Sequence, residues 1–361
     1  KAVKFSYNSY TMNYVSIYAG AAAINDDKYF KEIVSKVIMK YIHMFSAYLN
    51  EVKVMNEKNK KVCAVVVTYN RKELLCRNIK SLLKQTYPVD ILIYDNASTD
   101  GTEDELNNGG YLAMPNIIYV KGKYNGGGAT GFSNGEKLAY DKGYDYVWLM
   151  DDDGFCVNDY TLENLMLVQS KLDNAIVNSY VMGNIKDKEP TFDLGPYKTY
   201  GEILNNSVDG IVTGYGNPYN GTLVPRECFE AVGFTDRRFF IYGDETDFYY
   251  RTIAAGYTWM TSLESEYYHP INRSVFLERS FLGLKIDVKD QPVWKHYLEN
   301  RNGTYIKKKY LGIHVGLRHI VRILLTSILS KDKRAKRIYY GLLGLYDGNK
   351  EYFDRQIMFN A

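Results

Sequence analysis

Apolar residues in the middle of the chain fall into short runs that alternate with a helical pattern. The runs 62–67, 89–94 and 117–120 are rich in Val and Ile, and each has the length of a strand buried in a sheet. Between the first two runs, residues 72–85 repeat apolar side chains with the period of a helix. This alternation of strand and helix predicts a parallel sheet with right-handed crossovers.

A fourth apolar run, 147–150, continues directly into Asp151, Asp152 and Asp153. The run predicts another buried strand, so the three carboxylates lie at its C-terminal end, where open α/β sheets place their ligands. Adjacent carboxylates repel one another, and a divalent cation such as Mg²⁺ or Mn²⁺ removes that repulsion. A solvated acidic turn is the alternative, but the position directly after a buried strand favours a metal site.

Asn125, Gly126 and Gly127 open a glycine-rich loop that leads into a predicted helix, 132–142. Glycines let the backbone approach a ligand closely, and the N-terminus of a helix attracts phosphates and carboxylates. Glycine-rich turns are common, and this one is neither a GxGxxG motif after the first strand nor a Walker loop. The pattern therefore disfavours a Rossmann dehydrogenase, and on its own it indicates an anion site only weakly.

A second acidic cluster, Asp244, Glu245 and Asp247, stands between aromatic residues and leads into a predicted helix, 248–255. Crowded, partly desolvated carboxylates tend to have raised pKa values and can serve as general bases. Acids in a first helical turn also suit the helix dipole, which by itself accounts for one of them. The crowding of all three favours a functional role.

His269 follows two tyrosines, downstream of the acidic helix and just past a strand-like segment, 258–261. A single histidine is more often structural. A neutral imidazole could nevertheless complete a metal shell begun by the acidic triplet.

The composition, with 46% hydrophobic and 24% charged residues, is that of an ordinary globular protein. The formal net charge of +3 is unevenly spread, because residues 301–361 hold thirteen Lys or Arg and four Asp or Glu. This end is predicted to be helical from residue 290 and amphipathic over 313–329. Such a segment either lies on an anionic membrane surface or packs on the rest of the protein with a solvated basic face. No nucleic-acid-binding motif is recognised, so nucleic acid is not expected as a partner.

The four cysteines are far apart and form no CxxC pair, so neither a zinc site nor a disulfide framework is expected. A reducing cytoplasm is the predicted compartment. No signal-peptide pattern and no apolar run of about 18 residues is present, so no transmembrane helix is expected.

Residues 1–54 do not continue the strand and helix pattern, although 29–49 is typical of a helix. Residues 4–32 resemble part of a PLP-dependent aminotransferase of the histidinol-phosphate type, downstream of its cofactor lysine. Because the resemblance lacks the catalytic core, we expect no activity from this segment. We interpret it as an appendage or gene-boundary artefact; the alternative is an ordinary helical extension.

Residues 62–305 resemble a glycosyltransferase of family 2 with the GT-A fold. The matching motifs, in order, are TYNR (68–71), IYDNASTDGT, NGGGATGFSNG, WLMDDDG, GDETDFYYR and HYLENRN. The glycine-rich loop together with the triple aspartate is most similar to the galactofuranosyltransferase-like branch, which includes rhamnosyltransferases. The resemblance implies a Rossmann-like, mostly parallel α/β sheet flanked by helices in a catalytic domain at 55–289. A basic helical region, 290–361, would follow.

The resemblance also implies roles for particular residues. Asp151, Asp153 and His269 would bind Mn²⁺ or Mg²⁺, whereas Asp152 would face the donor sugar or the surrounding framework. Glu245 aligns with a catalytic base that is usually an aspartate, so the base is either Asp244 or Glu245. Residues of the loops after the strands would contact the nucleotide sugar, namely Thr68, Asn70, Arg71, Asp95, Asn125, Gly126 and Gly127.

The implied reaction is a single displacement that inverts the anomeric carbon. The expected donor is UDP-galactofuranose, and the expected acceptor is a cell-surface glycan or a lipid-linked sugar at the inner face of the membrane. A rhamnosyltransferase that uses dTDP-rhamnose is the enzymatic alternative. A non-catalytic nucleotide-sugar or glycan-binding module is the alternative from another class.

Overall fold

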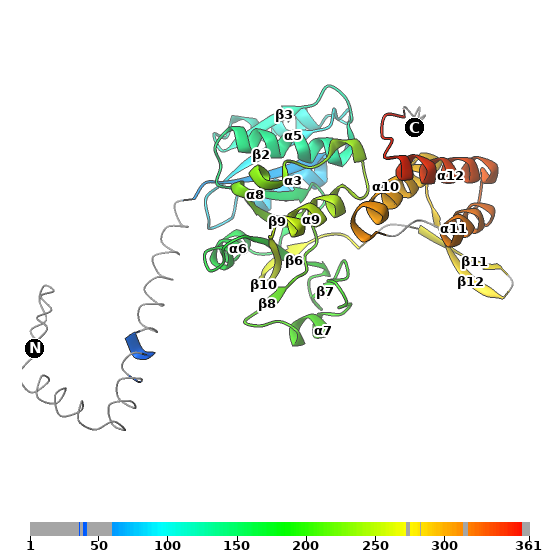
Figure 1. Cartoon of the computed structure of the whole chain (residues 1–361). Coiled ribbons are helices and arrows are strands. Elements are labelled where there is room, and N and C mark those ends of the chain that lie inside the picture. The colour runs from blue at the N-terminus through cyan, green and yellow to red at the C-terminus, as the bar shows by residue number, and fades with distance from the viewer. Residues whose placement is uncertain are drawn as a thin grey trace, which may run out of the picture. The chain divides into compact units, whose positions relative to one another are not determined.

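The computed structural model describes residues 36, 39–41, 60–271, 275–281, 283–312 and 317–355. The chain divides into two compact units, Lys1–Asn56 and Glu57–Ala361. Most of the helix predicted at 29–49 lies outside the described residues, although the described residues within it are helical. The second unit holds every motif of the predicted site (Figure 1).

A single large sheet forms the centre of this unit, in the order β3-β2-β1-β4-β9-β6-β10-β5. Strands β3, β2, β1 and β4 pair in parallel, β9 runs antiparallel to β4 and β6, and β10 is parallel to β6. The predicted, mostly parallel α/β sheet is therefore confirmed. The strands of this path are β1 (Val62–Thr68), β2 (Val89–Asp95), β3 (Ile117–Lys121), β4 (Tyr146–Asp151), β5 (Phe155–Cys156), β6 (Ala175–Asn184), β9 (Asn220–Pro225) and β10 (Thr258–Tyr268). Two short strands pair at its margin, β7 (Glu189–Pro190) with β6 and β8 (Ile211–Thr213) with β10.

Both faces of the sheet are buried, which explains the uninterrupted apolar runs in the sequence. Along β4, Trp148 and Met150 belong to one hydrophobic core, whereas Val147 and Leu149 belong to the core on the opposite face. Because a strand covered on both faces cannot accommodate a charge, the acidic triplet begins only where β4 ends.

The helices of this unit lie close to their predicted positions, with two informative differences. The predicted helix 132–142 begins five residues earlier, so that Gly127 forms its first turn, and the predicted helix 248–255 begins at Asp244. Asp244 and Glu245, called the acidic pair below, therefore lie in the first turn of the helix rather than before it. The helices are α3 (Lys72–Leu82), α4 (Thr102–Asn108), α5 (Gly127–Asp141), α6 (Thr161–Gln169), α7 (Tyr200–Asn205), α8 (Arg226–Val232) and α9 (Asp244–Ala254).

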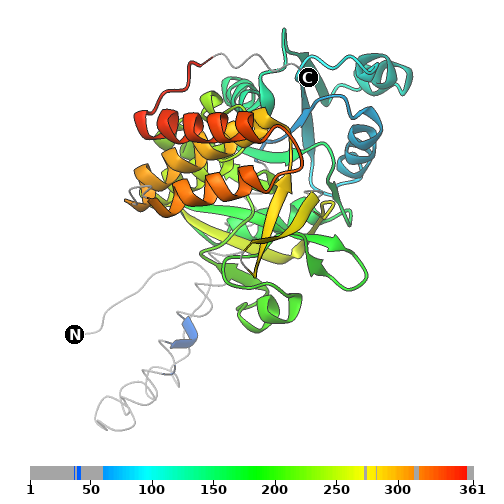
Figure 2. The ribbon, with the colours of Figure 1, turned by 90° about the vertical axis from the view of Figure 1, so that its right-hand side faces the viewer.

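The predicted C-terminal helices are present as α10 (Val293–Leu311), α11 (Leu317–Ile328) and α12 (Arg334–Lys350), which lie side by side in Figure 2. Helices α10 and α12 approach closely: a Cβ on Gly348 would lie only 2.2 Å from the Arg301 carbonyl oxygen. A hairpin that was not predicted, β11 (Val275–Phe281) with β12 (Leu284–Asp290), precedes them. Within the described residues, no helix is both long and apolar enough to cross a membrane.

Glu136 on α5 is a fully buried carboxyl group away from the acidic triplet. It accepts hydrogen bonds of 2.7 Å from the backbone N–H and the hydroxyl of Thr235. Burial raises the pKa of Glu136 from 4.5 to about 7. Between these two values the folded protein holds a proton that the unfolded chain has released, so this group makes stability fall as pH rises.

We expect Glu136→Gln to remove this loss of stability. The free energy of unfolding of the wild type should fall relative to that of the variant across the window from about pH 4.5 to about pH 7, by about 3 kcal/mol at most. Urea unfolding at several pH values measures the difference, with the exposed Glu227→Gln as control. Parallel pH profiles for the wild type and Glu136→Gln would contradict the expectation.

Candidate active site

The end of β4 and the end of β10 bring three metal-type ligands together. Asp151 is the last residue of β4, Asp153 follows in the next turn, and His269 comes directly after β10. One ligand atom from each of the three residues lies within 4.8 Å of the others, and His269 Nε2 is 3.2 Å from Asp153 Oδ1. Strand β5 brings this about, because it leaves the acidic turn and pairs with the last residues of β10.

The backbone of the acidic turn is held by side chains of α3. The Asn78 amide donates to the carbonyl oxygens of Asp151 and Gly154, at 3.1 and 2.9 Å. Arg77 donates to the carbonyl oxygen of Asp153 at 2.7 Å. The turn is thus fixed by the framework and leaves its carboxylates to make other contacts.

The electrostatics of this cluster favour a bound cation. Burial, together with the charges of Asp153 and Asp152, raises the pKa of Asp151 to about 7. Burial lowers the pKa of His269, but the hydrogen bond to Asp153 and the charges of Asp153 and Asp151 outweigh it, so the pKa of His269 is raised overall. Two carboxylates and an imidazole are ligands that Mn²⁺ and Mg²⁺ accept, and the crowded negative charge is what a cation would neutralise. The residues therefore fit a divalent metal.

Asp152 turns toward the framework. Its carboxylate accepts hydrogen bonds from the Thr68 hydroxyl at 2.7 Å and from Arg71 at 3.0 Å. The same Arg71 nitrogen lies 2.8 Å from Asp153 Oδ2. Two of the residues predicted to line the nucleotide pocket are therefore in direct contact with the acidic triplet.

Two other residues predicted to contact the nucleotide are Asp95 and Asn70, which form hydrogen bonds in the loops that follow β1 and β2. Asp95 is buried, and its oxygens accept from the Ser98 backbone N–H at 2.7 Å and from the Tyr119 hydroxyl at 2.6 Å. Asn70 has a positive φ of 52° and accepts from the Thr99 backbone N–H at 2.7 Å. These contacts shape a rim beside the acidic turn.

The glycine loop lies against the loop that precedes the acidic pair. Asn125 caps it by accepting from the Gly127 N–H at 2.9 Å. Gly127 has a φ of +76°, and a Cβ there would lie 2.1 Å from the carbonyl oxygen of Phe240. Only glycine allows both the backbone angle and this approach, which places Gly126 and Gly127 near the acidic pair.

The two members of the acidic pair differ in environment. Asp244 is 5% exposed, and burial, followed by the charge and hydrogen bond of Glu245, raises its pKa well above the ordinary value. The charge of Asp151 also contributes to this rise in the pKa of Asp244. Glu245 is partly exposed and accepts a hydrogen bond from the Gly243 N–H at 3.0 Å.

The third acid of the motif, Asp247, is used within the fold. It pairs with Arg251 at 2.7 Å and with Lys309 of α10 at 3.3 Å. Asp247 therefore links α9 to the C-terminal helices. Of the three crowded acids in the sequence, Asp247 has a structural role, and Asp244 and Glu245 are left as candidates for catalysis.

Two residues of α10, Arg301 and Asn302, hold the loop before the acidic pair, and the sequence assigned them no role. The Asn302 amide donates to the carbonyl oxygens of Phe239, Ile241 and Tyr242 at 2.8 to 3.1 Å. Arg301 donates to the carbonyl oxygen of Phe239 at 3.1 Å. In the sequence, both residues belong to the HYLENRN motif, but this motif does not indicate which groups they bind.

Comparison with a solved structure identifies the fold. The fold is similar to that of GalNAc-T7, solved with UDP, GalNAc and Mn²⁺, with a TM-score of 0.51 and 14% identity over 81% of this chain and 56% of that chain. The unit thus has the GT-A fold of glycosyltransferases.

Sequence comparisons define the family. The profile of glycosyl transferase family 2 matches residues 63–224. The galactofuranosyltransferase GlfT1 of Mycobacterium tuberculosis is 31% identical over 257 residues, which cover 68% of this chain and 81% of that protein. The chain belongs to glycosyltransferase family 2, and it is a glycosyltransferase.

The aminotransferase resemblance corresponds to a short partial match. Histidinol-phosphate aminotransferase of Brachyspira hyodysenteriae is 58% identical over 38 residues, which cover 10% of this chain and 11% of that protein. A fragment of this size carries no argument for aminotransferase activity.

Proposed function

We propose that this glycosyltransferase is inverting and metal-dependent, and that it transfers galactofuranose from UDP-galactofuranose. The acceptor is a hydroxyl group of a cell-surface glycan or of a lipid-linked sugar. The observation that supports the proposal is the cluster of Asp151, Asp153 and His269, and the charge of Asp151 also contributes to the raised pKa of Asp244. The donor sugar is taken from the relative's name, galactofuranosyltransferase.

Asp151, Asp153 and His269 would hold Mn²⁺ or Mg²⁺, which supplies positive charge against the diphosphate of the leaving nucleotide. The remaining steps belong to the chain. A carboxylate of the acidic pair takes the proton of the acceptor hydroxyl, and the acceptor oxygen attacks the anomeric carbon from the face opposite the diphosphate. The bond to the diphosphate breaks with its electron pair, so that a single displacement inverts the configuration.

We assign the role of base to Glu245 and a positioning role to Asp244. A base must be ionised and must reach the acceptor. Asp244 is nearly inaccessible, and burial together with the charge of Glu245 raises its pKa, which favours the protonated form, whereas Glu245 is partly exposed. As a neutral acid beside Glu245, Asp244 can orient the base and limit the negative charge near the metal cluster.

A donor screen with Mn²⁺ tests the proposal. UDP-galactofuranose and dTDP-rhamnose are each supplied with and without glycan acceptors, and the released UDP or dTDP is measured. Acceptor-dependent release of UDP supports the proposal, whereas release of dTDP would identify the rhamnosyltransferase. Binding of nucleotide sugar without turnover of any donor would favour a binding module.

We also propose a cytoplasmic enzyme that touches the inner face of the membrane peripherally through α11. This helix exposes Leu317, Val321 and Ile328, of which the last two are 43% and 46% exposed and stand two turns apart on one face. Basic residues follow directly in the segment 331–337. Apolar side chains beside cationic ones are the features of a helix that lies on an anionic membrane.

The variant Val321→Ser/Ile328→Ser should bind anionic vesicles roughly tenfold less tightly, because part of the apolar area of two side chains is lost. Turnover of a soluble acceptor should be unchanged. Vesicle flotation and UDP release measure the two effects. The variant Leu204→Ser/Val208→Ser removes two exposed apolar side chains elsewhere and serves as control. Equal flotation of both variants would refute the membrane contact.

A further inference from the structure

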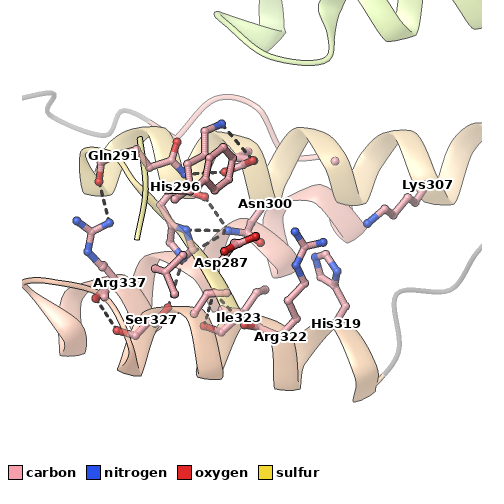
Figure 3. Close-up of a pocket in the computed structure, with 17 residues that line it drawn as sticks. Asp287, Gln291, His296, Asn300, Lys307, His319, Arg322, Ile323, Ser327 and Arg337 are labelled. Carbon is pink, nitrogen blue, oxygen red and sulfur yellow. Dashed lines mark hydrogen bonds and ion pairs between the residues drawn. The ribbon is translucent and has the colours of Figure 1, made fainter. Parts of the chain in front are cut away.

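A cavity lies in the C-terminal region. Its volume is about 370 Å³, and it is lined by residues of α10, α11, the β11–β12 hairpin and the start of α12 (Figure 3). None of the residues assigned above to the donor, the metal or the base lines it. It is therefore distinct from the candidate active site, and its size is within the range of small-molecule pockets.

Three basic side chains gather toward one end of this cavity: Lys307, His319 and Arg322 (Figure 3). Among the residues that the structure describes, none of the three forms an ion pair. The Nε2 atom of His319 is buried, and it has no hydrogen-bond partner among these described residues.

Several other charged residues that line the cavity have partners within the protein. Arg337 is bound by Asp332 at 2.7 Å. Glu299 accepts from Gln291 at 2.6 Å and lies 3.5 Å from Lys289. Asp287 also lines the cavity, but it makes no ion pair with the three basic side chains among the described residues. Within the part of the chain that the structure describes, the positive charge at this end thus has no protein counter-charge in direct contact.

Nearby positive charge disfavours the charged forms of Lys307 and His319. Burial and then the charge of Arg322 lower the pKa of Lys307. Burial and the charges of Lys307 and Arg322 lower the pKa of His319 to about 4. Like charges gathered without an anion cost free energy, and a bound anion would reverse that cost. Guanidinium and ammonium groups are the side chains that bind phosphate oxygens most strongly.

We propose that this cavity binds a phosphate-bearing ligand, with Lys307, Arg322 and His319 in contact with the phosphate oxygens. The site does not depend on the donor sugar or on the choice of base. The phosphate could belong to a lipid headgroup or to a soluble molecule. The exposed apolar side chain of Phe276 on β11 lines the cavity, which suits a lipid.

The experiment uses the full chain in EDTA, so that no cation carries an anion to the acidic cluster. Inorganic pyrophosphate is titrated by calorimetry, and flotation is measured with phosphatidylcholine vesicles with and without phosphatidic acid. The cavity variant is Lys307→Gln/Arg322→Gln. The matched control, Arg318→Gln/Lys336→Gln, removes the same charge from α11 and α12 outside the cavity. The exchange variant Lys307→Arg/Arg322→Lys keeps the charge and reports on folding.

The cavity variant should bind pyrophosphate at least about tenfold more weakly than the wild type, whereas the control and the exchange variant should stay near the wild type. If the ligand is a lipid, flotation with phosphatidic acid also falls in the cavity variant alone. If it is soluble, flotation is equal in the cavity and control variants while pyrophosphate binding still differs. Equal binding of both probes by the cavity and control variants would overturn the proposal.

Discussion

Asp153→Ala should lower turnover by more than roughly 100-fold even with Mn²⁺ in excess, because the change removes one of the three proposed metal ligands. Asp153 is also the residue that His269 and Arg71 contact, at 3.2 and 2.8 Å, so both side chains lose their orientation. Release of the nucleoside diphosphate measures the rate, and calorimetry with Mn²⁺ measures metal binding. Both should be lost together.

The same variant should remain folded, which separates a catalytic loss from a structural one. Asp153 is one of the charges that raise the pKa of Asp151, so its removal relieves repulsion in the protein without metal. Thermal unfolding in EDTA should therefore show no loss of stability. Asp141→Ala, which removes an exposed carboxylate at the end of α5, is the matched control. Substantial residual turnover in Asp153→Ala would refute the metal assignment.

The parallel half of the sheet was predictable because burial on both faces leaves a continuous apolar run. In β4, Trp148 and Leu149 are both fully buried, one on each face of the sheet. The apolar run therefore continues without a polar residue until Asp151, at the end of the strand. That abrupt end is a local signal, and it located the acidic triplet without any knowledge of the fold. The residues alone left the role of His269 open, since its position depends on the pairing of β5 with β10.

What the sequence did not reveal depends on contacts between distant segments. The β11–β12 hairpin was missed because the side chains of β11 are mostly exposed and leave no clear apolar alternation. The role of Asn302 was missed because its partners, carbonyl groups near residue 240, carry no sequence signal. Similarly, the basic cavity combines residues from α10 and α11, and a count of charges in the C-terminal region cannot separate paired from unpaired side chains.

Glu245→Gln should reduce kcat by roughly 10²- to 10⁴-fold, the usual contribution of a general base, with little change in the KM of the donor. Glutamine keeps a carbonyl oxygen that can accept the Gly243 N–H, so the turn at the start of α9 should be preserved. Release of the nucleoside diphosphate measures the rate, and turnover equal to that of the wild type would contradict the assignment of Glu245 as the base.

Asp244→Asn distinguishes the two members of the pair. A neutral, buried Asp244 is closely mimicked by asparagine, so we expect a smaller loss of kcat than in Glu245→Gln. The opposite pattern, with turnover retained in Glu245→Gln and lost in Asp244→Asn, would make Asp244 the base. In that case the cation would stabilise the deprotonated form of Asp244 by offsetting the charges of Glu245 and Asp151 that raise its pKa.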